Sequence, residues 1–162
     1  MTGGRTRTRS DDLQGETMTS SKAAESVHPV CAHDVAANRR RGGDIRVLLS
    51  PKTVGSTSGF FGVLTLEPGE FVSEHYHPYS EEFLYVVRGE LVMRVAGEPV
   101  ALRSGDALMI PIEVRHRLEN AGTEPAEVVF HLSPLAPRPD LGHVDTEPPP
   151  AADEPAPQVG GA

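Results

Sequence analysis

The sequence has little cysteine, a deficit of positive charge and no long apolar run, and each of these shortages excludes a class of protein. Cys31 is the single cysteine among 162 residues, which excludes an intramolecular disulfide and a cysteine-based zinc cluster and favours a reducing cytoplasm. Lys and Arg number 15 against 23 Asp and Glu, a formal net charge of -8, so a nucleic-acid surface is not expected. No segment reaches the roughly 18 apolar residues of a membrane span. The basic start of the chain lacks the apolar stretch of a signal peptide.

Polar ends flank a single domain. Residues 1–26 are rich in Thr, Ser, Gly and charge, and we expect them to be disordered. Residues 147–162 form a Pro/Ala/Gly-rich tail that is also expected to be disordered. The sequence therefore predicts one domain with a sizeable core at residues 27–146.

Within this domain, short runs of Val, Ile, Leu and Phe alternate with Gly and Pro, a pattern typical of an all-β sandwich or barrel. Short Gly-containing turns such as Ala96-Gly97-Glu98 predict antiparallel neighbours. We therefore expect antiparallel strands around one interior in a closed or nearly closed barrel. The expected strands are 45–49, 59–66, 71–77, 82–88, 91–95, 99–102, 107–110, 114–119 and 126–132.

Three histidines and a glutamate have the spacing of a metal site on β-strands. His75 and His77 are two residues apart, so their side chains share one face of a strand while Tyr76 points away. The same alternation directs Glu82 and His116 into the interior. Three imidazole nitrogens and one carboxylate oxygen suit one divalent metal ion, and among Zn, Fe, Mn and Ni we favour Zn or Fe.

Two further residues leave alternatives open. Glu81 competes with Glu82 as the carboxylate ligand, and strand alternation together with the spacing to Gly89 favours Glu82. His131 is a candidate catalytic acid/base or extra ligand on the strand after the metal motifs. The alternative for His131 is a strand histidine bonded to a backbone carbonyl.

Other polar residues are interpreted without a role in the site. Glu113 is expected to be an exposed turn residue, and the run Arg39-Arg40-Arg41 to be solvated. The three tyrosines are expected to pack on the strands: Tyr76, Tyr79 and Tyr85. No chemistry is assigned to three histidines outside the expected barrel: His28, His33 and His143.

The complete spacing resembles the two signature motifs of the cupin superfamily. The first motif reads Gly69-x5-His75-x-His77-x4-Glu82-x6-Gly89. The second reads Gly105-x5-Pro111-x4-His116-x3-Asn120, with Glu113 where the family often has glycine. The resemblance implies a jelly-roll-like antiparallel β-barrel of the cupin type.

Three longer strings, at 41–51, 74–89 and 129–139, resemble the small cupin proteins of bacterial aromatic polyketide clusters. These include tetracenomycin- and resistomycin-type cyclases and proteins of spore-pigment clusters. The resemblance implies cyclisation of a poly-β-ketone, carried by an acyl carrier protein, with the metal as Lewis acid and other synthase components as partners.

Two other functions stay open for such a protein: a cupin oxygenase acting on an aromatic polyketide intermediate, and a non-catalytic accessory subunit of the synthase. We also expect a homodimer, because pairing covers exposed sheet edges.

Overall fold

The computed structural model describes residues 27–157 and residue 159, so the disorder expected for residues 1–26 lies outside the described residues. The elements in that part of the chain are η1 (Ala32–Asp34), β1 (Asp44–Leu49), α2 (Pro51–Val54), β2 (Phe60–Leu66), β3 (Phe71–Tyr76), β4 (Glu81–Arg88), β5 (Glu90–Val95), β6 (Glu98–Arg103), β7 (Ala107–Ile110), β8 (His116–Glu119), β9 (Ala126–Ser133), η2 (Pro139–Leu141) and β10 (Val144–Asp145). None of the helices among them is long and apolar enough to cross a membrane.

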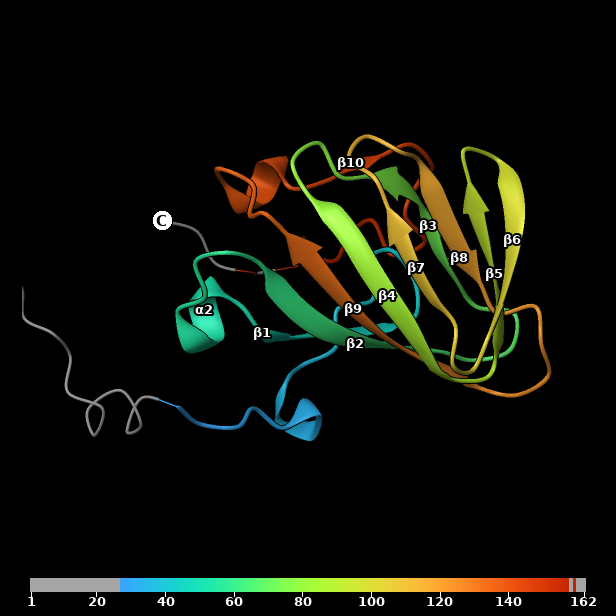
Figure 1. The fold of residues 1–162 in the computed structure, drawn as a ribbon, viewed down its shortest axis with the longest axis horizontal. Helices are drawn as coiled ribbons and strands as arrows, with labels where there is room; N and C mark the ends of the chain where they lie inside the picture. Colours follow the sequence, from blue (N-terminus) through green and yellow to red (C-terminus); the bar gives the residue numbers. More distant parts are fainter. Residues whose placement is uncertain (1–26, 158, 160–162) are drawn as a thin grey trace, which may run out of the picture.

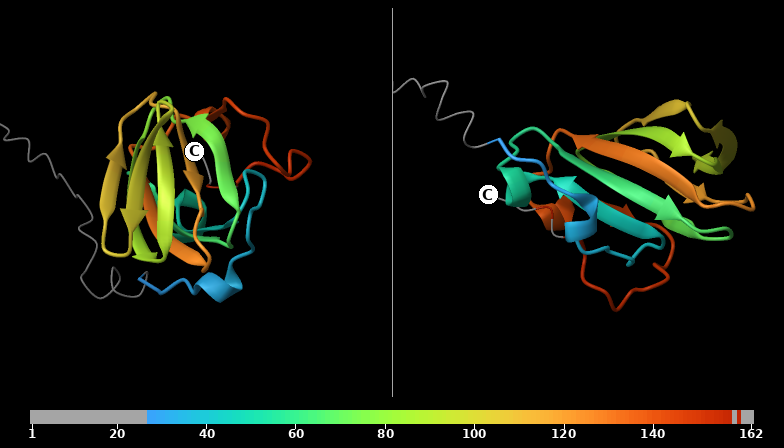
Figure 2. Two further views of the ribbon diagram at one scale, coloured as in Figure 1. Left: turned by 90° about the vertical axis from the view of Figure 1, so that its right-hand side faces the viewer. Right: turned by 90° about the horizontal axis from the view of Figure 1, so that it is seen from below.

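The strands form two antiparallel sheets of five strands each, in the orders β1-β2-β9-β4-β7 and β10-β3-β8-β5-β6 (Figure 1). The sheets face one another around a shared interior, which the end view in Figure 2 shows. The predicted all-β, jelly-roll-like antiparallel fold is confirmed. It consists of two separate facing sheets instead of one closed barrel, because no ladder of hydrogen bonds joins them within the described residues.

Alternation along the strands builds the core between the sheets. On β9, the buried residues Ala126, Val128, Phe130 and Leu132 alternate with half-buried ones. Each fully buried Leu or Phe side chain contributes roughly 1.5–3 kcal/mol. Neighbouring strands of the same sheet and strands of the facing sheet supply the remaining buried members: Leu64, Leu66, Val72, Leu84, Val86, Leu91, Met93, Leu102, Ile110 and Leu118.

Two turns have an unusual backbone. Ala96 and Gly97 join β5 to β6 with φ values of 50° and 90°, as a two-residue hairpin of type I′ requires. Glu113 is exposed, as expected, and has a φ of 64°. Glycine adopts this conformation without strain, which explains the glycine common at this place in the cupin motif. The Glu113 N–H donates to the carbonyl of His77 at 3.0 Å, so this turn is tied to the site described below.

The C-terminal segment returns across the domain. Its two-residue strand β10 pairs with β3, and it was not predicted because two residues show no periodicity. Further along, the Ala151 N–H donates to the carbonyl of Arg40 at 3.1 Å, and Asn38 Nδ2 donates to the carbonyl of Pro155 at 2.9 Å. Hydrogen bonds therefore cross the domain boundary predicted at residue 147.

Candidate metal centre

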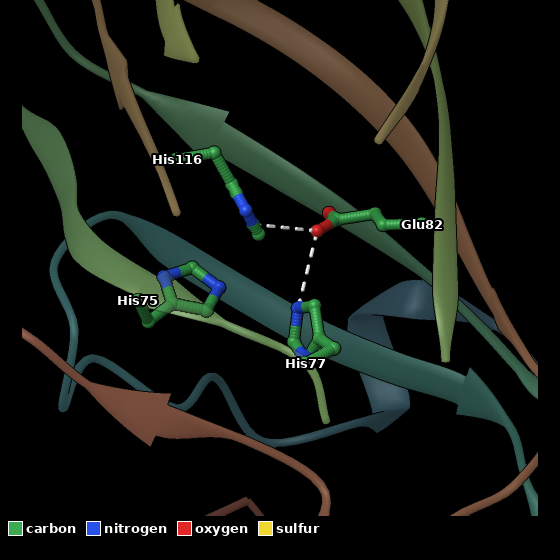
Figure 3. A group of neighbouring side chains, drawn as sticks. All are labelled: His75, His77, Glu82 and His116. Atoms are coloured by element: carbon green, nitrogen blue, oxygen red, sulfur yellow. Dashed lines mark hydrogen bonds and ion pairs between the residues drawn. The ribbon is translucent and has the colours of Figure 1, made fainter. Parts of the chain in front are cut away.

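The interior contains a cluster of three histidines and one glutamate that come from both sheets (Figure 3). His75 lies on β3 and His116 on β8, His77 directly follows β3, and Glu82 lies on β4 of the facing sheet. One ligand atom from each residue lies within 4.8 Å of the others. The histidines are between 2% and 8% exposed. The structure thus brings together the four residues predicted as metal ligands, whereas Glu81 is not part of the cluster.

The three histidine rings are oriented in the same way, by a backbone carbonyl next to Nδ1. A carbonyl oxygen only accepts hydrogen bonds, so Nδ1 carries the proton and Nε2 of the neutral ring keeps its lone pair. The bonds run from His75 to Ser73 at 2.8 Å, from His77 to Gly142 at 2.9 Å and from His116 to Val114 at 2.9 Å.

Glu82 faces two of these Nε2 atoms. Its Oε2 atom lies 2.9 Å from Nε2 of His116 and 3.2 Å from Nε2 of His77. The Nε2 atom of His116 is buried and has no aligned hydrogen-bond partner among the described residues. A carboxylate oxygen and a nitrogen lone pair repel each other at such distances unless a cation, a proton or a metal ion, lies between them. The arrangement fits a divalent metal ion, and the N3O ligand set suits a first-row metal.

Burial and neighbouring groups set the charges in this cluster. Burial lowers the pKa of His75 well below its usual value, and His116 and His77 add to this effect. Burial alone would raise the pKa of Glu82, but the adjacent rings of His116 and His77 hold it well below its usual value. Burial likewise opposes a charge on His116, yet Glu82 raises the pKa of that ring. Glu82 is therefore ionised at neutral pH, and its negative charge favours a cation between the carboxylate and the Nε2 atoms that face it.

A β-bulge on β3 aligns His75 with the site. Val72 pairs with Leu118 and His75 with His116, so the interval on β3 is one residue longer than the interval on β8. Val72 and His75 are both buried as a result, although strict alternation would direct them to opposite faces.

The cluster lines an apolar cavity of about 420 Å³. Its walls include Val72, Met93, Phe130 and Leu132 from the inner faces of the two sheets. The C-terminal segment adds residues 135–137, 139, 142, 143, 157 and 159 to the lining. A cavity of this size with mainly apolar walls suits a small aromatic or hydrophobic molecule.

Arg41 and His143 also line the cavity, and sequence reasoning missed both. The prediction that Arg41 is solvated is wrong, because this residue is 5% exposed and its Nε donates to Oδ1 of Asp145 at 2.6 Å. Burial lowers the pKa of His143 from 6.5 to about 4, and the nearby charge of Arg41 adds to the effect. No local pattern predicts the Arg41–Asp145 pair, since the two residues are 104 positions apart.

His131, the candidate acid/base group, does not line the cavity. Phe130 and Leu132 point inward, so alternation places His131 on the outer face of the sheet. Its ring centroid lies 6.3 Å from that of Phe83, which is 42% exposed. The three tyrosines are also absent from the cavity lining among the described residues.

Two facing antiparallel sheets that enclose a His-His-Glu-His cluster define the protein as a cupin. A family model described as "Cupin domain" matches residues 62–132. The crystal structure of a predicted oxalate decarboxylase from Thermotoga maritima is similar, with a TM-score of 0.59 and 26% sequence identity. That alignment covers 67% of this chain and 100% of the other.

Two relatives show which members of the family the chain is similar to. Polyketide synthase CurC of Streptomyces cyaneus is 60% identical over 121 residues, which cover 75% of this chain and 79% of the relative. Tetracenomycin polyketide synthase protein TcmJ of Streptomyces glaucescens is 54% identical over 132 residues, which cover 82% of this chain and 89% of the relative. The chain belongs to the cupin family that includes these polyketide synthase proteins, and the resemblance inferred from its motifs is confirmed.

Proposed function

We propose that this protein is a metal-dependent cupin that assists the cyclisation of a poly-β-ketone in aromatic polyketide biosynthesis, for a spore pigment or a related antibiotic-like compound. One observation carries the proposal. Three histidines donate Nδ1–H to carbonyls and so present lone pairs beside the Glu82 carboxylate, inside an apolar cavity. The similarity to proteins named as polyketide synthase components supports the substrate class.

His75, His77, Glu82 and His116 would hold one divalent metal ion, for which we favour Zn or Fe. Such an ion polarises carbonyl oxygens and stabilises the enolate of a 1,3-dicarbonyl unit. The carbonyl acceptors at Nδ1 fix the tautomer and the direction of each ring, which prepares the ligands for the ion.

The apolar walls of the cavity would control the conformation of the bound poly-ketone. Ring closure requires one carbon of the poly-ketone to meet one particular carbonyl, and a flexible chain in water offers many wrong closures. Met93, Phe130 and Leu132 exclude water and restrict the conformations of the bound chain. Selectivity for one ring then comes from the shape of these walls.

Metal analysis and product analysis of the same variants test the proposal. His75→Ala and His77→Ala are expected to lose bound metal and the correctly cyclised product together, in a pathway reconstituted with its synthase. His131→Ala is the matched control, because this ring lies on the outer face and the variant is expected to keep both. Correct product from a metal-free variant contradicts the proposal.

The same assay separates two alternatives. An oxygenase consumes oxygen and loses turnover under strictly anaerobic conditions, whereas a cyclase keeps its product there. An accessory subunit keeps full product output in the ligand variants and loses it only when the protein is omitted. A cyclase loses the product in both cases.

We also infer a homodimer, which the outer face of the sheet with β4 and β7 supports. Phe83, Tyr85, Val87 and Met109 are between 42% and 46% exposed there, and exposed apolar patches mark interaction surfaces. Delivery of the intermediate by an acyl carrier protein and a location in the cytoplasm stay predictions.

A further inference from the structure

Arg41 brings a permanent charge into the apolar cavity. Its Nε donates to Asp145, but its Nη2 is buried without a hydrogen-bond partner among the described residues. Within the described lining, Arg41 is the only Lys or Arg and Glu82 the only Asp or Glu. A guanidinium stays protonated even when burial lowers its pKa, as it does here.

The backbone fixes Arg41 beside the strand that leads to the histidines. The carbonyl of Arg41 accepts from the N–H of Ser73 on β3 at 2.9 Å. The next residue, Gly42, has a φ of 99°, and a Cβ atom there would lie 2.0 Å from the carbonyl oxygen of Phe71. Only glycine permits this close approach, so the local sequence holds the arginine against the sheet.

Asp145 completes this anchoring. It lies on β10 directly opposite His75 on β3, so the Arg41–Asp145 pair sits next to a proposed metal ligand. Asp145 engages Nε of Arg41 and leaves the Nη2 donors unused. Unused donors of a charged group inside an apolar site favour a ligand that brings an acceptor oxygen, above all one with negative charge.

We propose that Arg41 binds a negatively charged oxygen of the substrate, from a carboxylate or from the enolate of a 1,3-dicarbonyl, and thereby orients it toward His75, His77 and Glu82. Asp145 is a positioning residue that directs the guanidinium. This inference rests on the proposed function and specifies its substrate class: a mainly apolar molecule that carries an acidic oxygen. The planar fork of the guanidinium matches the two oxygens of either group.

Titration calorimetry of the full chain, as purified, tests this inference with three naphthalene probes. 2-Naphthoate and 2-naphthamide have the same ring and similar size and differ in charge, and 1-(2-naphthyl)-1,3-butanedione supplies the enolate in a buffer alkaline enough to ionise the diketone. Arg41→Gln is expected to lower the affinity for an anionic probe by about tenfold or more, and the affinity for 2-naphthamide by less than about twofold.

Two variants make the result specific. Arg39→Gln is the matched control, because Arg39 also pairs with an aspartate, Asp44, but on the surface with its side chain 52% exposed. It is expected to bind all probes like the wild type. Arg41→Lys keeps the charge and loses the planar fork, so a partial loss is expected, and this variant serves as the test if Arg41→Gln does not fold.

The outcomes decide both the inference and the source of the oxygen. A loss confined to 2-naphthoate identifies a carboxylate, a loss confined to the diketone identifies an enolate, and a loss of both fits either group. The inference is overturned if the Arg41 variant binds all probes like the wild type. It is also overturned if the affinity for 2-naphthamide falls as much as the affinity for the anionic probes. It also fails if neither anionic probe binds the wild type saturably. Probe binding requires no turnover, so its failure is distinguishable from failure of the cyclisation assay.

Discussion

His75 and His116 lie directly opposite one another on β3 and β8, with ring centroids 4.4 Å apart. Pairing on neighbouring strands therefore sets the distance between these two proposed ligands. Glu82 approaches from the facing sheet, so its distance to the histidines depends on how the two sheets pack. The proposed centre is thus sensitive both to strand register and to the core between the sheets.

Replacing the carboxylate tests the choice between two adjacent glutamates. Glu82→Gln removes the charged ligand, and we expect the metal affinity to fall by more than about tenfold. Replacing a group that only hydrogen-bonds to a metal ligand already lowers the metal affinity by about tenfold or more. Glu81→Gln is the matched control, because Glu81 is outside the cluster. Metal content by mass spectrometry after dialysis against a weak chelator measures the effect. The opposite ranking of the two variants would assign the ligand to Glu81.

Asn120, the last position of the second cupin motif, is expected to act on stability. It is 1% exposed and donates to the carbonyls of Leu66 and Glu124, each at 2.9 Å. Asn120→Ala leaves buried carbonyls without donors, so the free energy of unfolding should fall by about 2 kcal/mol or more. Urea denaturation measures the loss, and Asn38→Ala, which removes a more exposed bond to Pro155, should cost less. Equal losses would refute this role.

Asp44 is expected to make stability depend on pH in the acid range. A hydrogen bond from Arg46, at 2.7 Å from Nε to Oδ1, lowers the pKa of Asp44 below its ordinary value of 3.8. The folded chain therefore holds this proton less tightly than the unfolded chain, and the stabilisation is present above the ordinary value and lost as pH falls through the folded pKa.

Asp44→Asn should therefore be less stable than the wild type near neutral pH, and the difference should shrink below about pH 4. Thermal unfolding across the pH range measures it. Asp153→Asn is the control, because this carboxylate is exposed. A difference that stays constant down to the acid limit would show that the ion pair does not contribute through its charge.

The homodimer is tested at Phe83, in the middle of the exposed apolar face of β4. Light scattering should give the wild type about twice the chain mass of 17.4 kDa. Phe83→Lys should shift the mass toward that of one chain, because a buried unpaired charge opposes association. Tyr79→Lys changes a similarly exposed aromatic residue outside the strands and should not shift it. A monomeric wild type would contradict the homodimer.

Much of this protein follows from short-range patterns in the sequence. Short apolar runs bounded by Gly and Pro predicted nine strands, and the structure places all of them with small shifts at their ends. Alternation along these strands predicted one interior for His75, His77, Glu82 and His116, because neighbours two apart on a strand share a face, and the structure groups the four. Glycine-containing turns predicted antiparallel neighbours, since short connections permit no other pairing.

Other features of the fold depend on tertiary packing and cannot be predicted from the periodicity of the sequence. The separation into two sheets, the bulge that turns both Val72 and His75 inward, and the return of the C-terminal segment depend on contacts between distant parts of the chain. The outward position of His131 shows that a strand histidine needs the register of its own strand before it can be assigned to a cavity.

The sequence alone therefore determined the four clustered side chains and the antiparallel all-β class, because strand alternation and turn chemistry are local. Only the tertiary structure placed Arg41 in the cavity. The burial of its charge depends on Asp145, and a strand pairing between distant segments brings that partner beside His75.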